Sequence, residues 1–157
     1  MTAQEMGNEF CEQNQLSASA CSWQAWAFGG APDLLAQLVL AGVKTATASA
    51  APLYQLENEP FPQEGEYSVI LDSAGEAVCI IQTTCVYTVP FCQVSPEHAF
   101  KEGEEDRSLE SWQKIHRDFF SNVMAEAGLS FSETMPVVCE EFRLVHPPVP
   151  CDSRLSS

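Results

Sequence analysis

Lys44 is the residue best placed to do chemistry, because its neighbours in the sequence carry almost no other charge. Between Leu34 and Leu56 the only other ionisable side chain is Tyr54. Removing an ammonium group from water is costly. A lysine among Ala, Val and Leu is therefore expected to have a perturbed pKa or a fixed partner, and both are commoner at functional sites. In the alternative interpretation, Lys44 extends past a helix end into water.

Thr47 follows Lys44 by three positions and carries a hydroxyl. A threonine becomes a nucleophile when a neighbouring base takes its proton, and a lysine held neutral by apolar surroundings could be that base. Side chains three apart on an ideal strand point to opposite faces, so the chain must bend between them. Gly42, Ala46 and Ala48 permit such a bend. The alternative is that Thr47 is an ordinary strand threonine.

The segment Glu102–Asp106 holds four carboxylates in five positions. Crowded carboxylates raise one another's pKa, which suits them to proton transfer near neutral pH. For Glu104 and Glu105 we favour the alternative, a solvated loop that caps the next helix. Glu102 is a candidate if the fold brings it to Lys44.

Trp112 and His116 are four positions apart and so share one face of a predicted helix. His116 could move protons, although a histidine beside an apolar stripe is more often packed and hydrogen-bonded. The sequence has no P-loop, dinucleotide-binding glycine pattern, serine elbow or HExxH pattern.

Hydrophobic spacing and turn residues predict the elements that would position these side chains. We expect helices over about 32–41, ended by Gly42, and from about 108 to 128, ended by Gly128. We expect strands at 45–50, 67–71, 77–89 and 137–145, a hairpin turn at 72–75, a short apolar turn or helix at 23–28, and an irregular segment with at most one helical turn at 95–106. This content predicts an α+β domain, and the long strand at 77–89 is compatible with a curled or barrel-like sheet.

Composition indicates one globular domain of 157 residues, with 45% apolar and 18% charged residues. We expect a flexible arm at residues 1–20, a domain at 21–146 and a tail at 147–157. No apolar run approaches the roughly 20 residues of a membrane span, and the first twenty residues lack the pattern of a secretory signal.

The seven cysteines form no Cys-x-x-Cys pair. We therefore expect reduced thiols in a cytoplasmic protein, with no membrane association, disulfide framework, bound metal or cofactor.

The formal charge of −15 bears on the ligand. Nucleic acids are held largely by lysines and arginines that neutralise phosphates, and this chain has 7 basic against 22 acidic residues. A long RNA or DNA is disfavoured as a partner, and a small neutral or weakly charged molecule is favoured.

The pattern Gly42-x-Lys44-x-x-Thr47 resembles the signature of the ASCH domain family, whose fold is related to that of PUA RNA-binding domains. The order of the surrounding features also resembles a bacterial ASCH subgroup of about this length. These features are Trp26-Ala27-Phe28-Gly29, Leu38–Gly42, Glu102-Gly103-Glu104, Asp106, Ser108, Trp112, His116 and Phe119-Phe120. The resemblance covers about residues 22–146 and implies a curled antiparallel β-barrel flanked by helices.

The resemblance also implies a function. Family members are associated with RNA binding, some small bacterial ones are amidohydrolases that remove the acyl group from acylated cytidine, and others are described as ribonucleases. Matched to the amidohydrolases, Thr47 would be the nucleophile, Lys44 would activate it, and Glu102 would relay protons to the leaving amine, with Glu104 as the fallback. Where the signature often has an arginine, this chain has Ser49. We expect a cleft for a nucleoside or nucleotide, with Ser49, Trp26, Glu104 and His116 as weaker candidates for substrate binding. The alternatives are a non-catalytic RNA-binding module and a ribonuclease that uses the same cleft.

Overall fold

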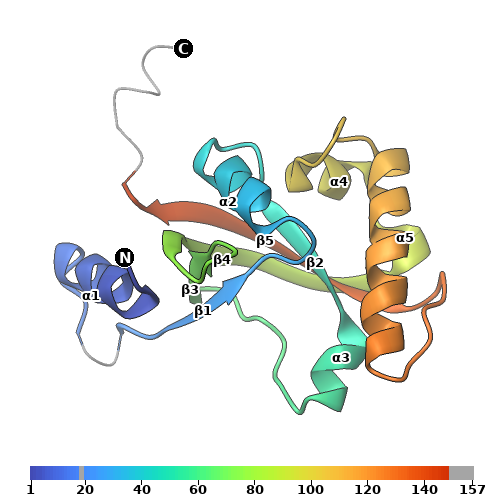
Figure 1. The fold of residues 1–157 in the computed structure, drawn as a ribbon, viewed down its shortest axis with the longest axis horizontal. Helices are drawn as coiled ribbons and strands as arrows, with labels where there is room; N and C mark the ends of the chain where they lie inside the picture. The colour runs from blue at the N-terminus through green and yellow to red at the C-terminus, as the bar shows by residue number, and fades with distance from the viewer. Residues whose placement is uncertain (18–19, 149–157) are drawn as a thin grey trace.

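The computed structural model describes residues 1–17 and 20–148 and contains one five-stranded sheet in the order β1-β3-β4-β5-β2 (Figure 1). The pair β1–β3 is parallel, and the other neighbours are antiparallel. The strands are β1 (Trp23–Ala27), β2 (Ala46–Ala50), β3 (Tyr67–Leu71), β4 (Ala77–Pro90) and β5 (Pro136–His146). The helices are α1 (Ala3–Gln13), α2 (Pro32–Leu40), α3 (Ala51–Leu56), α4 (Pro96–Glu102) and α5 (Leu109–Glu126), with a 3₁₀ turn η1 at Phe91–Gln93.

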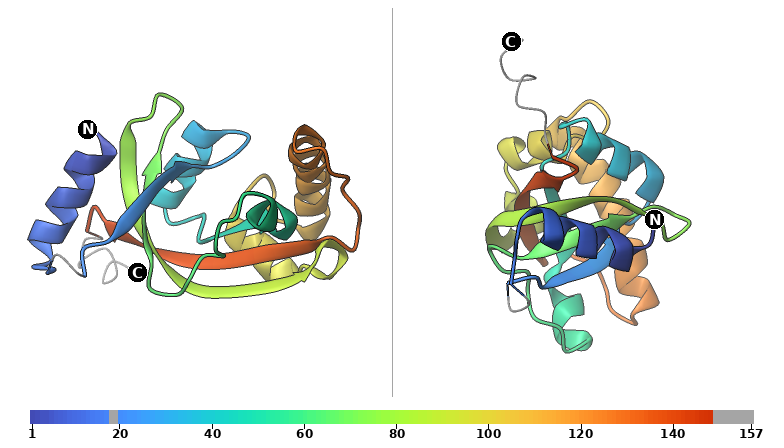
Figure 2. Two further views of the ribbon diagram at one scale, coloured as in Figure 1. Left: turned by 90° about the horizontal axis from the view of Figure 1, so that it is seen from below. Right: turned by 90° about the vertical axis from the view of Figure 1, so that its left-hand side faces the viewer.

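The sheet is strongly curled, and β4 is the strand that bends (Figure 2). Its pairing with β5 shifts register between Ile80 and Ile81 and again between Thr83 and Cys85. Such bulges bend a strand and increase its twist. One half of β4 therefore pairs with β3 while its other half continues along β5, which gives an open half-barrel and confirms the predicted α+β fold class.

The helices divide the core into three buried clusters. Helix α5 packs over the far ends of β4 and β5, with Phe120 and Trp112 against Phe91. Helix α2 packs through Leu35, Ala36 and Val39 on the sheet. Figure 2 shows α1 on the other side of β3, away from α2. The concave side of the sheet, between α2 and α5, is left for a site.

Most predicted elements are confirmed, and two differ. Residues Trp23–Ala27 form an edge strand rather than a turn or helix, because their pairing with β3 outweighs a local pattern too short to specify either state. The segment at 95–106 contains the two-turn helix α4 instead of at most one turn. Ser95 caps its first turn by accepting a hydrogen bond from the His98 amide, Pro96 suits its first position, and Gly103 ends it with a φ of 73°.

The expectation of a loose arm at residues 1–20 is wrong for α1. Thr2 and Glu5 form a capping box, and Met6 and Phe10 are buried against β3 and β4. The expectation that all thiols are reduced is also wrong, since Cys11 forms a disulfide with Cys21 and so ties α1 to the start of β1.

Other cysteines of the described chain, Cys79, Cys85, Cys92 and Cys139, are free. The predicted tail at 147–157 lies outside the described residues from position 149 onward. In the part of the chain that the structure describes, no helix combines the length and the apolar character needed to cross a membrane.

Candidate functional site

Lys44 is buried, with only 1% of its surface exposed, yet it is not isolated. Its Nζ lies 3.3 Å from Oε1 of Glu102 and 3.0 Å from Oε2 of Glu104, and 5.2 Å from the centre of the Phe28 ring. It also donates to the backbone carbonyl of Glu102 at 3.4 Å. Two carboxylates and a ring face thus replace the water that an ammonium needs. Fixed ionic partners, rather than an extension into solvent, explain why Lys44 can stand alone in an apolar segment of the sequence.

Two glycine turns position Lys44 against α4. After α2, Gly42 adopts a φ of 78°, and the amides of Val43 and Lys44 both donate to the carbonyl of Leu38. Gly103 at the end of α4 lies against this turn, where a Cβ atom would be 2.6 Å from the carbonyl oxygen of Val43. Only glycine fits that approach together with the positive φ. The start of β2 and the end of α4 are therefore held in direct contact.

Glu102 is the centre of the network. Its Oε2 accepts hydrogen bonds from Nε2 of His98 and Nε1 of Trp112, both at 2.7 Å. Its Oε1 faces Lys44 and, at 3.5 Å, Nε2 of His116. Burial raises the pKa of Glu102, but the charge of Lys44 and the hydrogen bonds from His116 and His98 outweigh it and hold this pKa well below the usual range. Glu102 is thus a buried anion that fixes the groups around it.

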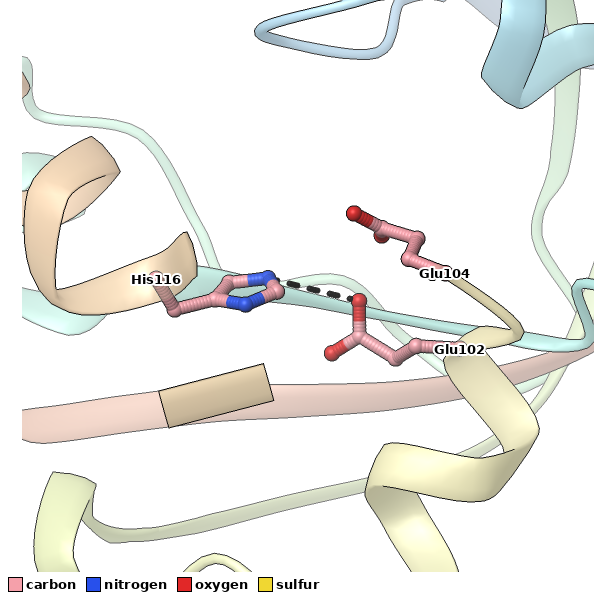
Figure 3. Close-up of side chains that lie close together, drawn as sticks. All are labelled: Glu102, Glu104 and His116. Carbon is pink, nitrogen blue, oxygen red and sulfur yellow. Dashed lines mark ion pairs between the residues drawn. The ribbon is translucent and has the colours of Figure 1, made fainter. Parts of the chain in front are cut away.

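His116 faces this carboxylate from α5, as Figure 3 shows. Its Nδ1 donates to the carbonyl of Trp112 at 2.9 Å, and its ring stacks on that of Trp112 with centroids 4.2 Å apart. Burial lowers the pKa of His116, but the hydrogen bond to Glu102 and the charges of Glu102 and Glu104 raise it overall. His116 is therefore biased towards its charged form.

Glu102, Glu104 and His116 are also donors of the kinds that bind metal ions, and their ligand atoms lie within 4.8 Å of one another. Both carboxylates already contact the Lys44 ammonium, which holds the place a cation would take. The group is better explained as an ion-pair network than as a metal centre.

Two cavities meet at Thr47 on the concave side of the sheet. We call one the lysine cavity; it has a volume of about 490 Å³ and is lined by Lys44, Glu102, Glu104 and His116. We call the other the aromatic cavity; it measures about 420 Å³ and is lined by Trp26, Tyr54 and Phe61 among others. Residues that line both are Phe28, Gly29, Thr47, Ala48 and Phe119. No hydrogen bond within the described chain joins Thr47 to Lys44 or Glu102, but all three border the same space.

The weaker candidates divide between the cavities. Trp26 and Ser49 line the aromatic cavity, where Ser49 Oγ lies 2.8 Å from the hydroxyl of Tyr54. Glu104 and His116 line the lysine cavity. Among the described residues that line either cavity, Lys44 is the only lysine or arginine. Against it stand eight carboxylates, those of Glu57, Glu59, Glu66, Glu102, Glu104, Glu105, Asp118 and Glu140.

Sequence reasoning missed two residues of the site. His98 contacts Glu102 from one turn earlier in α4, and its spacing of four would have indicated the contact if this helix had been predicted. Glu140 is buried in β5 and lines the aromatic cavity. In the apolar segment predicted as the closing strand, the pair Glu140-Glu141 was a signal, because alternation must turn one of the two towards the sheet's covered face.

The domain combines a curled sheet with a buried lysine, Lys44, just before β2. Comparison with known proteins identifies the family to which such a domain belongs. The model of the ASCH domain matches residues 24–146, so the chain belongs to the ASCH domain family. The ASCH domain from Lactobacillus crispatus JV V101 is 35% identical, over 90% of this chain and 94% of that one, with a TM-score of 0.80. A protein from Enterococcus faecalis V583 is 32% identical, over 90% and 86%, also with a TM-score of 0.80. None of the curated proteins compared with the chain matches it.

Proposed function

We propose that this protein is an amidohydrolase that removes the acyl group from an acylated cytidine-like nucleoside. The observation that carries the proposal is the buried Lys44 ammonium, ion-paired at a cavity that is also lined by Thr47. A buried ion pair is costly to maintain and is weak evidence for stability alone. Its position beside a hydroxyl and a substrate-sized cavity supports a chemical role.

In the proposed reaction, Lys44 first passes a proton to Glu104, its nearer and more exposed carboxylate partner. The neutral amine then takes the hydroxyl proton of Thr47 while Oγ1 forms a bond to the acyl carbon. The C–N bond breaks, and the Lys44 ammonium returns the proton to the leaving amine. Lys44 then takes a proton from water, and the hydroxide attacks the threonine ester. The ester C–O bond breaks, Lys44 gives the proton to Thr47 Oγ1, and the carboxylic acid is released. The proton on Glu104 returns to Lys44, which restores the starting ion pair.

We assign Glu102 a positioning role rather than the proton relay suggested by the family resemblance. A carboxyl whose pKa lies well below the usual range accepts a proton poorly, and both of its oxygens are already engaged. It would hold Lys44 and His116 at the cavity wall. Glu104, whose only ionic contact within the described chain is Lys44, is the better proton acceptor.

The charges of the cleft favour a nucleoside over a nucleotide or RNA. Eight carboxylates and one lysine line the two cavities, and a phosphate would meet repulsion on most sides. An uncharged acylated nucleoside avoids this cost. The ring-lined aromatic cavity offers a surface for its base, and the lysine cavity is left for the acyl group.

The test is incubation of the purified protein with N4-acetylcytidine and chromatography of the products. The wild type should release cytidine, and Lys44→Ala and Thr47→Ala should each lower kcat/KM by at least about a thousandfold, by analogy with the loss of a nucleophile or its base. Lys114→Ala, an exposed lysine on α5, is the matched control and should keep full activity. Absence of turnover by the wild type would contradict the proposal.

The same variants distinguish the alternatives. A ribonuclease in which Lys44 stabilises the phosphoryl transition state should retain RNA cleavage in Thr47→Ala. A non-catalytic RNA binder should show an affinity that falls steeply with salt and no cytidine release.

A further inference from the structure

Glu140 lies beside Thr47 in the cleft. The two residues are direct partners in the antiparallel pairing of β2 with β5. Directly opposed residues of such a pair project their side chains from the same face of the sheet, with Cβ atoms about 5 Å apart. Both line the aromatic cavity. A ligand atom near the Thr47 hydroxyl on this side is therefore within reach of the Glu140 carboxyl.

One carboxyl oxygen of Glu140 is engaged and the other is open. Thr83 Oγ1 donates to Oε2 at 2.6 Å, which fixes the orientation of the group. No hydrogen bond from the described residues reaches Oε1. Glu140 is only 6% exposed and, unlike Glu102, has no lysine, arginine or histidine contact in the described chain. A buried carboxyl that lines a cavity and has one oxygen without a partner in the described chain is available to a ligand.

The surroundings make the Glu140 carboxyl easier to protonate than an ordinary glutamate side chain. Burial raises the pKa of Glu140; the hydrogen bond from Thr83 lowers it, and the charge of Glu66 raises it further, so that it lies above the usual value. Tyr54, the other titratable group that interacts with this carboxyl, is uncharged in its acid form, and burial raises the pKa of its hydroxyl. Because Oε2 accepts the hydrogen bond from Thr83, a proton taken up by the carboxyl would lie on Oε1, which has no partner in the described chain and could donate it to a ligand in the cavity.

We propose that Glu140 is a specificity-determining residue that donates a hydrogen bond from Oε1 to a ring nitrogen of the bound heterocycle. In a cytidine-like base the matching acceptor is N3, the ring atom adjacent to the carbon that carries the amine. With N3 held at Glu140, the amide attached next to it lies near Thr47, the partner of Glu140 across the strands. This inference rests on the proposed function for the identity of the base.

The test measures binding rather than turnover, so that it stands apart from the hydrolysis assay. Cytidine and 3-deazacytidine differ by the replacement of N3 with C–H. By calorimetry the wild type should bind cytidine about tenfold more tightly, the effect of one hydrogen bond worth about 1.4 kcal/mol. Glu140→Leu should bind the two ligands equally, and Glu140→Gln, which can still present an N–H to the cavity, should restore most of the preference.

Glu141→Gln is the matched control, because the next residue of β5 points to the other face and pairs with Lys101. It should keep the wild-type preference. Equal binding of both ligands by the wild type, a preference that survives in Glu140→Leu, or no binding of either ligand would overturn the inference. A clear preference for cytidine without any hydrolysis of acetylcytidine would instead overturn only the proposed function.

Discussion

Glu102 shows at the scale of one residue how a buried charge becomes tolerable. Lys44, His98, Trp112 and His116 all direct hydrogen atoms at its two oxygens. Each contact compensates for part of the water lost on burial. The arrangement also prevents Glu102 from moving, which explains why we assign the mobile proton to Glu104. Removal of Lys44 would leave the buried Glu102 charge without its ion-pair partner, and removal of Trp112 would leave Oε2 with one hydrogen bond fewer.

Glu102→Gln should lower the free energy of unfolding by about 3–5 kcal/mol, the usual cost of removing one partner from a buried pair. Because the pKa of Glu102 is lowered in the folded protein, its charge contributes fully to the free energy of unfolding above about pH 4.5. This contribution is lost as the pH falls through the pKa of Glu102 in the folded state. Because the pKa of His116 is raised in the folded protein, its charge contributes fully to the free energy of unfolding below about pH 6.5. This contribution is lost as the pH rises through the pKa of His116 in the folded state. The difference from wild type should therefore be largest between these limits.

Urea unfolding of both proteins across pH 3 to 9 measures this dependence. Glu133→Gln, which removes a surface ion pair with Arg117, is the control and should change stability little at any pH. A difference between wild type and Glu102→Gln that stays constant from pH 6 to pH 3 would contradict the buried-anion interpretation.

At the scale of elements, the site exists because the end of α4 meets the turn between α2 and β2. The amide of Thr45 donates to the carbonyl of Lys101 at 2.7 Å, and Arg107 donates to the carbonyls of Phe100 and Val43. These contacts hold the two segments together and so bring the side chains of Lys44 and Glu102, which are far apart in the sequence, into contact. The junction depends on the absence of a side chain at Gly103.

Gly103→Ala should destabilise the protein by about 2–4 kcal/mol, the sum of a left-handed conformation and an overpacked contact. The new Cβ would lie 2.6 Å from the Val43 carbonyl, so the turn must move and Lys44 with it. Activity should therefore fall more than stability alone explains. Chemical unfolding and the hydrolysis assay measure the two effects.

Gly128→Ala is the matched control for this substitution. Its φ of 76° is nearly the same, but no atom lies within 4 Å of the added Cβ, and the residue follows α5 away from the site. It should cost only about 1–2 kcal/mol and leave kcat/KM unchanged. An equal loss of activity in both variants would show that the contact with Val43 does not position Lys44.

For the whole molecule, α1 extends the domain beyond the segment that carries the family pattern. It covers the outer face of the sheet, and the disulfide, an ion pair between Glu9 and His146, and the packing of Met6 and Phe10 all join it to the strands. None of these contacts touches the cleft. We infer that α1 stabilises the curled sheet and that the chemistry does not depend on it.

Cys11→Ser should lower the free energy of unfolding by about 2–3 kcal/mol, as expected for a crosslink between positions ten apart. Thermal unfolding should show that a reductant lowers the Tm of the wild type but not that of the variant. Cys92→Ser, at an exposed free cysteine, should behave as wild type in both conditions. A wild-type Tm that does not respond to full reduction would contradict a stabilising role for the disulfide.

Local patterns predicted much of this structure. The stripe at 32–41, the spacing of Leu109, Trp112, Ile115 and Phe119, and the runs at 67–71 and 77–89 correspond to α2, α5, β3 and β4. Each depends on the contacts of a side chain with neighbours three or four positions away, or on alternation along one strand. The strand at 23–27 and the docking of α1 were not predictable in this way, because their partners are distant in the sequence.

By itself, the sequence determined that Lys44 needed a partner, since an ammonium in an apolar segment cannot remain buried alone. It also indicated the family, through the spacing of glycine, lysine and threonine together with the order of the features around them, and the match of the family model to residues 24–146 confirms it. Only the tertiary structure decided that the partners are Glu102 and Glu104, about sixty positions away, and that Glu140 faces Thr47. Contacts between residues so far apart in the sequence depend on strand register and on the docking of helices. Both are set by packing over the whole sheet rather than by neighbours along the chain.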